Sequence, residues 1–147
     1  MRYSIRPAKA EDLEPMMAIA HEGIRPYFEA LWDWVQRDQE LAFRDNFNLD
    51  IVSIVEVDGC SAGYLKIEEH DDHIYLVGIF LGAQYRRSGL GTKLIQDLIQ
   101  RARKEQRPIR LRVLTPNPAQ HLYRRLGFIE TEASATHIHM EFNGSSA

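Results

Sequence analysis

Two glycines at the start of an amphipathic run constrain this chain more than any other feature. Residues 84–99 read QYRRSGLGTKLIQDLI, and apolar residues recur at helical spacing as far as Ala102. Glycine weakens a helix, but it permits positive φ and lets another group approach the backbone closely. The N–H groups of a first helical turn lack partners within the helix and carry partial positive charge. Since Arg86 and Arg87 add formal charge, this turn is typical of a pyrophosphate-binding site.

The basic residues of the chain are concentrated around this turn. Residues 84–126 carry 11 Lys and Arg against 2 acidic side chains, whereas residues 1–83 carry 7 against 16. A basic segment in a chain whose net charge is −3 indicates a local anionic ligand, not a general nucleic-acid surface. Nucleic acid is therefore not expected as a partner.

The spacing excludes two other phosphate-binding motifs. In a Walker A loop the second glycine is followed directly by Lys, whereas Gly91 is followed by Thr92. A Rossmann fingerprint needs a small residue at position 94, which is leucine here, and it belongs in an opening strand–helix–strand unit. The alternative interpretation of the turn is a tight strand-to-helix connection that binds nothing.

Length and composition predict one compact domain. The chain has 147 residues, of which 44% are hydrophobic, and we expect the domain to cover residues 1–142, with a frayed polar tail at 143–147. No stretch reaches the roughly 18 apolar residues of a membrane span, and no signal peptide is evident, so no membrane partner is expected. A single cysteine, Cys60, is compatible with a cytoplasmic location.

Periodicity predicts an α/β fold. A first strand at 3–7 precedes a helix over 9–24 and a second helical region over 25–47, which we expect to break near Pro26. After them, turn residues separate further strands and helices. The expected strands lie at 52–55, 62–67, 74–81, 108–115 and 136–142, and the expected helices at 90–102 and 117–127. This order predicts a mixed central sheet of about six to seven strands flanked by about four helices.

Gly78 interrupts an apolar run, YLVGIFLG at 75–82. A glycine inside a strand weakens the sheet and marks a bulge or a close approach of another group. Either would open a gap beside this strand, where an extended ligand could pair with the backbone.

Two stretches together resemble the GCN5-related N-acetyltransferase (GNAT) superfamily. LGAQYRRSGLGTKLIQDLI, with Arg86-x-x-Gly89-x-Gly91, resembles its motif A, and NPAQHLYRRLGF resembles its motif B. YSIRPAKAEDLEPM is similar to the first strand and helix of the superfamily, and VDGCSAGYLKI is similar to a hairpin between its strands. The resemblance covers roughly residues 2–142, and it implies the GNAT fold and acetyl-CoA as co-substrate.

The resemblance also implies which residues hold acetyl-CoA. Backbone N–H groups of the glycine turn would bind the pyrophosphate, with Arg86 adding charge. The backbone of Phe80 and Leu81 would pair with the pantetheine arm and polarise the thioester carbonyl. Asn117 would contact the pantetheine amides where two neighbouring strands diverge. The turn residues are Arg87, Ser88, Gly89, Leu90, Gly91 and Thr92.

Tyr123 matches the superfamily tyrosine that protonates the departing thiolate. A phenol near the sulfur can donate a proton without being ionised at neutral pH. The alternative is a helix residue packed between Leu122 and Leu126.

The general base is not identified by the sequence. A free alkyl amine has a pKa of about 10, so something must remove a proton before attack. Glu68 and His137 are candidates that would act through water. His70, His73, His137 and His139 show no conventional zinc spacing, so no metal is expected.

The acceptor site is the least defined part of the prediction. Tyr27, Phe28 and Trp32 are candidates for an aromatic wall, with core packing as the alternative. The acidic N-terminal half favours a cationic acceptor, either a small molecule or a peptide. We therefore predict an acetyl-CoA-dependent N-acetyltransferase that acts on a primary amine by direct attack in a ternary complex.

Two alternatives to this prediction stay open. The chain could be an acetyl-CoA-binding sensor without turnover, or it could use another acyl-CoA or a hydroxyl acceptor. A homodimer is also possible for a member of this superfamily.

Overall fold

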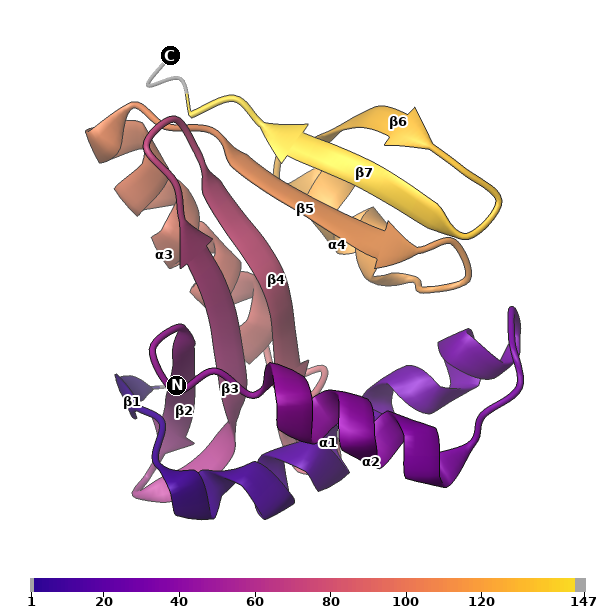
Figure 1. Ribbon diagram of the computed structural model, residues 1–147. Helices are drawn as coiled ribbons and strands as arrows, with labels where there is room; N and C mark the ends of the chain where they lie inside the picture. The colour runs from indigo at the N-terminus through magenta and orange to yellow at the C-terminus, as the bar shows by residue number, and fades with distance from the viewer. Residues whose placement is uncertain (1, 145–147) are drawn as a thin grey trace.

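The computed structural model describes residues 2–144 as one mixed sheet with helices on both faces (Figure 1). Within that range the sheet has seven strands in the order β1-β2-β3-β4-β5-β7-β6. The strands are β1 (Ser4–Pro7), β2 (Val52–Val57), β3 (Cys60–Glu69), β4 (Ile74–Leu81), β5 (Ile109–Leu114), β6 (Ile129–Ala133) and β7 (His137–Phe142). The helices are α1 (Leu13–Glu29), α2 (Gln36–Asn46), α3 (Leu90–Glu105) and α4 (Ala119–Arg125), with short 3-10 turns η1 (Ala10–Asp12) and η2 (Ala83–Tyr85). The expected α/β architecture is confirmed.

The sheet opens between its two central strands. Strands β4 and β5 run parallel, and they pair only from Ile74 to Leu76 against Ile109 to Leu111. Beyond these pairs the strands diverge, and Figure 1 shows them close at one end and apart at the other. All the other neighbouring strands in the described sheet pair antiparallel.

A bulge in β4 lies next to this opening. Against β3, Lys66 pairs with Gly78 but Ile67 pairs with Leu76, so Val77 is the extra residue. A Cβ atom at position 78 would collide with the ring of Phe80, which folds back over the glycine. The irregularity expected at Gly78 is therefore confirmed, and any side chain at this position would have to displace the ring of Phe80.

Two apolar cores hold the helices against the sheet. The larger core receives the whole apolar stripe of α3, as its spacing predicts, together with Tyr123 and Phe128. The smaller core joins α1 to β2 and β3 through Met16, Ile54 and Tyr64. Within residues 2–144 no helix has both the length and the apolar character that crossing a membrane requires.

The structure corrects the expected helix break. Helix α1 continues through Pro26 to Glu29, and the interruption lies between Ala30 and Val35. Proline removes one bond from a helical ladder. Here the last turn is held by Phe28, whose ring lies 4.9 Å from that of Trp32 and 5.5 Å from that of Trp34.

Two further differences concern the C-terminal region. Strand β6 was not expected, because every one of its residues is exposed and no apolar alternation marks it. Of the expected tail, Asn143 is exposed, but Gly144 is buried at positive φ against the backbone of Arg107, so the tail is packed at that residue. Residues 145–147 lie outside the described part of the chain.

Candidate active site

The divergence of β4 and β5 opens a cleft with two adjoining cavities. The larger, of about 750 Å³, is lined by Arg87, Gly89 and Gly91 at the start of α3. The smaller, of about 350 Å³, is lined by Tyr75, Arg112 and other side chains of β3, β4, β5 and β7. The residues that line both cavities are Ile24, Ile79, Phe80, Asn117, Ala119 and Tyr123. The two cavities therefore adjoin, and these residues form the wall between them.

The glycine turn leaves a helix N-terminus open toward the larger cavity. Gly89 precedes α3 at φ 86°, and the first ladder bond runs from the N–H of Lys93 to the carbonyl of Gly89, at 3.0 Å. The N-cap residue is glycine, so it has no side chain with which to cap this end. Since Gly89, Gly91 and Thr92 line the cavity, the first-turn N–H groups are placed where an anion can bind.

The two arginines of the turn have different surroundings. Arg86 donates from Nε to the carbonyl of Leu81 at 3.1 Å, and its guanidinium pairs with Glu22 of α1, whose pKa it lowers. Gly23 leaves room for this, since a Cβ there would lie 3.4 Å from Nη2 of Arg86. Arg87 lines the cavity at φ 59° and forms no ion pair with any described carboxylate. Arg86 thus links α1 to the end of β4. Because the guanidinium of Arg87 has no such ion pair, it is the better placed of the two to bind an anion in the cavity.

Strand β4 offers unpaired backbone along the cleft. After Leu76 no strand of the described chain pairs with β4 on its β5 side. Phe80 and Leu81 belong to this segment, and both line the larger cavity. An extended ligand could therefore add to this edge as a strand would.

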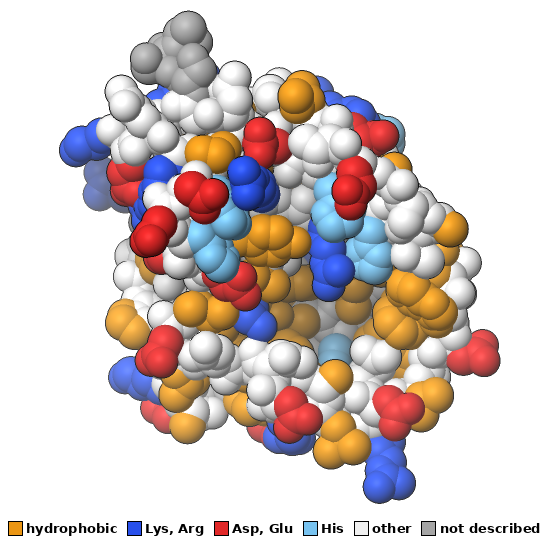
Figure 2. All heavy atoms as spheres, turned by 45° about the horizontal axis from the view of Figure 1, so that its top comes forward, with side chains coloured by type: hydrophobic (Ala, Val, Ile, Leu, Met, Phe, Trp, Pro, Cys, Tyr) orange, Lys and Arg blue, Asp and Glu red, His pale blue; other side chains and the backbone are white. Residues whose placement is uncertain are grey.

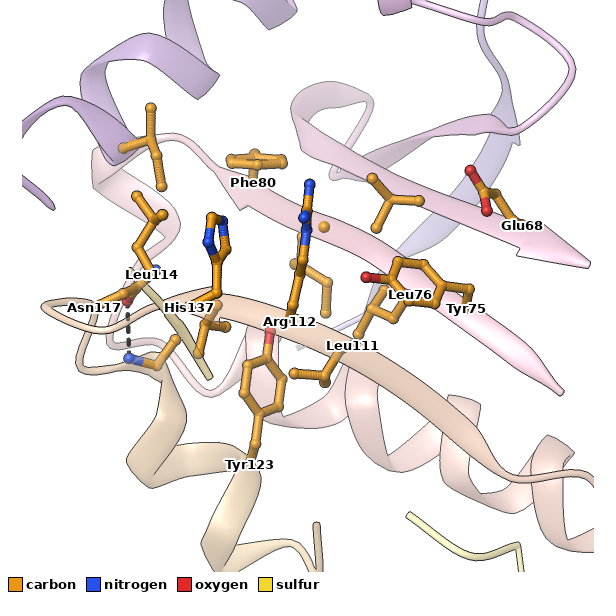
Figure 3. Close-up of a pocket in the computed structure, with 16 residues that line it drawn as sticks. Glu68, Tyr75, Leu76, Phe80, Leu111, Arg112, Leu114, Asn117, Tyr123 and His137 are labelled. Atoms are coloured by element: carbon orange, nitrogen blue, oxygen red, sulfur yellow. Dashed lines mark hydrogen bonds between the residues drawn. The ribbon is translucent and has the colours of Figure 1, made fainter. Parts of the chain in front are cut away.

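Tyr123 lies at the junction of the two cavities. Its side chain is 7% exposed and packs against Phe128, with the ring centroids 5.5 Å apart. Burial raises the pKa of Tyr123 to about 12, so the phenol keeps its proton at neutral pH. Figure 3 shows its hydroxyl directed from α4 toward β5 at the cleft.

Asn117 lies two residues before helix α4 and also lines both cavities. Its Oδ1 accepts a hydrogen bond from the N–H of Ala119 at 2.9 Å, as the dashed line in Figure 3 marks. This Asx turn fixes the side chain beside Tyr123. The arrangement brings together the predicted amide-binding residue and the predicted acid.

The two candidate bases lie at opposite ends of the smaller cavity. His137 lies near Asn117, while Glu68 lies beyond Tyr75 (Figure 3). Nδ1 of His137 is 2.9 Å from Oγ1 of Thr136. Burial, then the charge of Arg112, then His139, lower the pKa of His137. The imidazole of His137 is therefore neutral near pH 7. The other candidate, Glu68, lies with its Oε1 3.2 Å from Nε2 of His70.

The three candidate aromatic residues do not form one wall. The Trp32 ring lies 6.3 Å from that of His137, and Phe28 packs on Trp32, so both are near the smaller cavity. Tyr27 instead lines the larger cavity, beside Arg87. Successive helix residues point about 100° apart, which separates Tyr27 from Phe28.

The side chains missed by the sequence analysis are Arg112 and Tyr75. Both line the smaller cavity, and Figure 3 shows Arg112 between His137 and Tyr75. The alternation of β5, IRLRVL, could have identified Arg112 as a charge on the face opposite the core. Figure 2 shows the hollow on this side of the molecule, with an apolar floor and with histidine, basic and acidic side chains around it.

The histidines do not converge. His70 and His73 stack on one another at 4.4 Å, at the turn between β3 and β4, whereas His137 and His139 lie on β7. In the part of the chain that the structure describes, no three His, Cys, Asp or Glu side chains are grouped as metal ligands.

Comparison of the sequence with known proteins identifies a family profile and a curated relative. The profile of the Acetyltransferase (GNAT) family matches residues 13–128. An uncharacterised N-acetyltransferase of Methanocaldococcus jannaschii is 28% identical over 143 residues, covering 88% of this chain and 62% of that protein. The chain thus spans less than two thirds of the length of this curated relative.

Solved structures share the fold over nearly the whole chain. The PaiA N-acetyltransferase of Thermoplasma acidophilum, in complex with coenzyme A, aligns with a TM-score of 0.77 at 18% identity, covering 97% of this chain and 99% of that one. The ribosomal-protein-S18-alanine N-acetyltransferase of Escherichia coli aligns with a TM-score of 0.71 at 23% identity, covering 99% and 96%. Because the family profile matches most of the sequence and the fold agrees, this chain belongs to the GNAT family of acetyltransferases.

Proposed function

We propose that this chain transfers an acetyl group from acetyl-CoA to a primary amine by direct attack within a ternary complex. The observation that carries the proposal is the position of Tyr123, a buried and protonated phenol that lines both of the adjoining cavities. A group at that junction would lie between a cofactor that enters from one side and an acceptor that enters from the other.

The larger cavity suits the cofactor. The open N–H groups at the start of α3, with Arg87, would hold the pyrophosphate. The pantetheine arm would extend along β4 beyond Leu76, against the backbone of Phe80 and Leu81, and reach Asn117. The bound coenzyme A in the PaiA complex, which has the same fold, supports acetyl-CoA as the co-substrate.

The reaction needs a proton removed at one atom and supplied at another. The amine nitrogen would bond to the acetyl carbonyl carbon, and the carbon–sulfur bond would break as coenzyme A leaves. Tyr123 would donate its proton to the sulfur as negative charge develops there, and it would later regain one from solvent. Its high pKa keeps that proton in place until it is needed.

His137 is the better candidate for the base. It is neutral at pH 7 and lies at the same end of the smaller cavity as Asn117, so a water molecule could pass the amine proton to it. Glu68 lies at the other end and is engaged with His70. We therefore assign the role of base to His137.

The test combines two measurements on the purified protein. Calorimetry would give the affinity for acetyl-CoA, and release of free thiol would report turnover with a panel of amines, amino acids, polyamines and peptides. We expect binding together with turnover on one class of acceptor. Tight binding without thiol release from any acceptor would favour a sensor, and release with hydroxyl compounds only would favour an O-acyltransferase.

A further inference from the structure

Two arginines on β5 differ in whether their charge is compensated. Arg110 and Arg112 lie two residues apart and so share one face of the strand. Arg110 is opposite Glu141 of β7, and its Nε donates to that carboxylate at 2.8 Å. Arg112 is opposite His139, and no carboxylate within residues 2–144 forms an ion pair with it. The sheet thus neutralises one guanidinium and leaves the other available.

The available guanidinium lies in the wall of the smaller cavity. Figure 3 shows Arg112 and His137 projecting to the same side of the strands that carry them. The positive charge of Arg112 adds to burial in lowering the pKa of His137, and it opposes the rise that burial causes in the pKa of Tyr75. Among the described residues that line this cavity, Glu68 is the only carboxylate; it lies beyond Tyr75 (Figure 3), and its Oε1 is 3.2 Å from Nε2 of His70.

The phosphates of coenzyme A do not account for Arg112. Their proposed site is at the start of α3 with Arg87, in the larger cavity. Arg112 does not line that cavity. Its charge therefore faces the side of the cleft that receives the acceptor.

We infer that Arg112 binds a carboxylate of the acceptor, so that the acceptor is a free amino acid, with its amine at the thioester and its carboxylate on the guanidinium. The inference rests on the proposed acetyltransferase function and names its substrate class. A guanidinium presents paired N–H donors that match the two oxygens of a carboxylate. A cavity of about 350 Å³ suits a small ligand.

This inference reverses the expectation drawn from the charge of the N-terminal half. The acidic side chains of α1 and α2 are largely engaged, since Glu14 pairs with Arg44 and Glu29 pairs with Arg25. Net charge over 83 residues therefore does not describe the site. At the end of the smaller cavity that holds His137, the nearest charge among the described lining residues is that of Arg112, whereas Glu68 lies at the other end, beyond Tyr75 (Figure 3).

The test uses acceptors that differ only in the carboxylate. Thiol release would be measured with the twenty amino acids and with the carboxamide of each. A carboxamide has the less basic amine, which is more often neutral at the same pH, so basicity alone would favour it. We expect kcat/KM for the preferred amino acid to exceed that for its carboxamide by about 10- to 100-fold.

Variants of the two arginines form a matched pair. Arg112→Gln is expected to lower kcat/KM for the amino acid until it equals that of the carboxamide, with the carboxamide changed less than about threefold and acetyl-CoA affinity unchanged. Arg110→Gln should leave the ratio of the two acceptors as it is in the wild type. Equal losses on both acceptors in Arg112→Gln, or a wild type without preference for the carboxylate, would overturn the inference. So would turnover confined to phosphorylated amines such as phosphoethanolamine.

Failure of the proposed transferase function would give a different result from failure of the inference about Arg112. If no amine supports thiol release, the transferase proposal fails, and binding then decides the inference. N-acetylated amino acids and their carboxamides would be titrated into the protein saturated with coenzyme A. Binding that requires the carboxylate and is lost in Arg112→Gln would support a carboxylate site at Arg112 although the transferase proposal had failed, and binding that ignores either change would contradict that site as well.

Discussion

The two halves of the cleft are built from different parts of the chain. The half proposed to hold the cofactor consists largely of backbone, namely the first turn of α3 and the unpaired edge of β4, with glycine where the backbone must be exposed. The half proposed to hold the acceptor consists of side chains from β3, β4, β5 and β7, such as Tyr75, Arg112 and His137. A backbone surface can hold one ligand while its side chains vary, whereas a side-chain surface changes its ligand with each substitution. We therefore expect substitutions in the two halves to have separable effects, except at Tyr123.

The largest effect is expected where the halves meet. Tyr123→Phe removes the proton donor but keeps the packed ring, so kcat should fall about 10²- to 10⁴-fold while acetyl-CoA affinity is nearly unchanged. Rapid-mixing assays of thiol release and calorimetry would give the two quantities. Tyr85→Phe, which removes a hydroxyl from the larger cavity alone, is the control. An unchanged kcat would remove Tyr123 from the chemical step.

A negative charge at the start of α3 should weaken acetyl-CoA binding without lowering the stability of the fold. Gly91 is in the helix, and a Cβ there would meet only Leu81 Cδ1 at 3.8 Å, so Gly91→Glu fits the fold. A carboxylate at a helix N-terminus stabilises the helix but repels a pyrophosphate. We expect acetyl-CoA affinity to fall about 100-fold or more, with a melting temperature equal to or above that of the wild type.

Gly91→Ala is the control for that variant, because it adds the same Cβ without charge. It should keep most of the affinity. If Gly91→Glu binds acetyl-CoA as the wild type does, the cofactor phosphates lie somewhere other than the helix start.

The base assignment predicts a change in the pH profile. The pKa of His137 lies below its ordinary 6.5, so the imidazole accepts a proton at pH 7 and loses this ability only as the pH falls through that lowered pKa. The acceptor amine must also be neutral, so in the wild type two protonations suppress kcat/KM at acid pH. His137→Gln should lower kcat about 10- to 100-fold near pH 7. In its pH profile, the fall of kcat/KM at acid pH should then reflect protonation of the amine alone.

His139→Gln is the matched control, because His139 lies on the same face of β7 but does not line the smaller cavity. It should keep both limbs of the profile. Two limbs persisting in His137→Gln would transfer the role of base to another group, with Glu68 the first to test.

The smallest effect is expected at the edge of the acceptor half. Trp32 is 40% exposed and lies 6.3 Å from His137, ring to ring. Trp32→Ala should raise KM for the acceptor about 3- to 10-fold without changing acetyl-CoA affinity, because only a partly buried contact is lost. Leu41→Ala removes an exposed apolar side chain of α2 and should change neither quantity. A fall in acetyl-CoA affinity in Trp32→Ala would mean that the two halves are not independent.

The parts of the fold that the sequence predicts best are those that depend on local requirements. The stripe of α3, the turn at Gly89 and the bulge near Gly78 each follow from what a few adjacent residues can do, and each lies where it was expected. The proposed cofactor half is made from these parts. Its candidate residues therefore stand out in the sequence, whereas those of the proposed acceptor half do not.

The parts that escaped prediction depend on partners distant in sequence. Pro26 did not end α1 because contacts of Phe28 with residues beyond the helix hold the last turn. Strand β6 forms because β7 offers an edge, although its own residues are exposed. Arg112 differs from Arg110 in the residue that it faces across the sheet, which is His139 and not a carboxylate. A single sequence contains no direct sign of such pairings.

The short seam between β4 and β5 has a mechanical consequence. Within the sheet, three residue pairs join the strands β1–β4 to the strands β5–β7, and the core under α3 joins the same two groups on one face. The sheet therefore resembles two leaves that are held together along a narrow seam and by that core. A ligand in the gap would touch both leaves, β4 on one and the α4 region on the other, and would act as a brace as well as a reactant. The leaves would then be held most firmly while cofactor and acceptor are both in place, and they would loosen as the products depart.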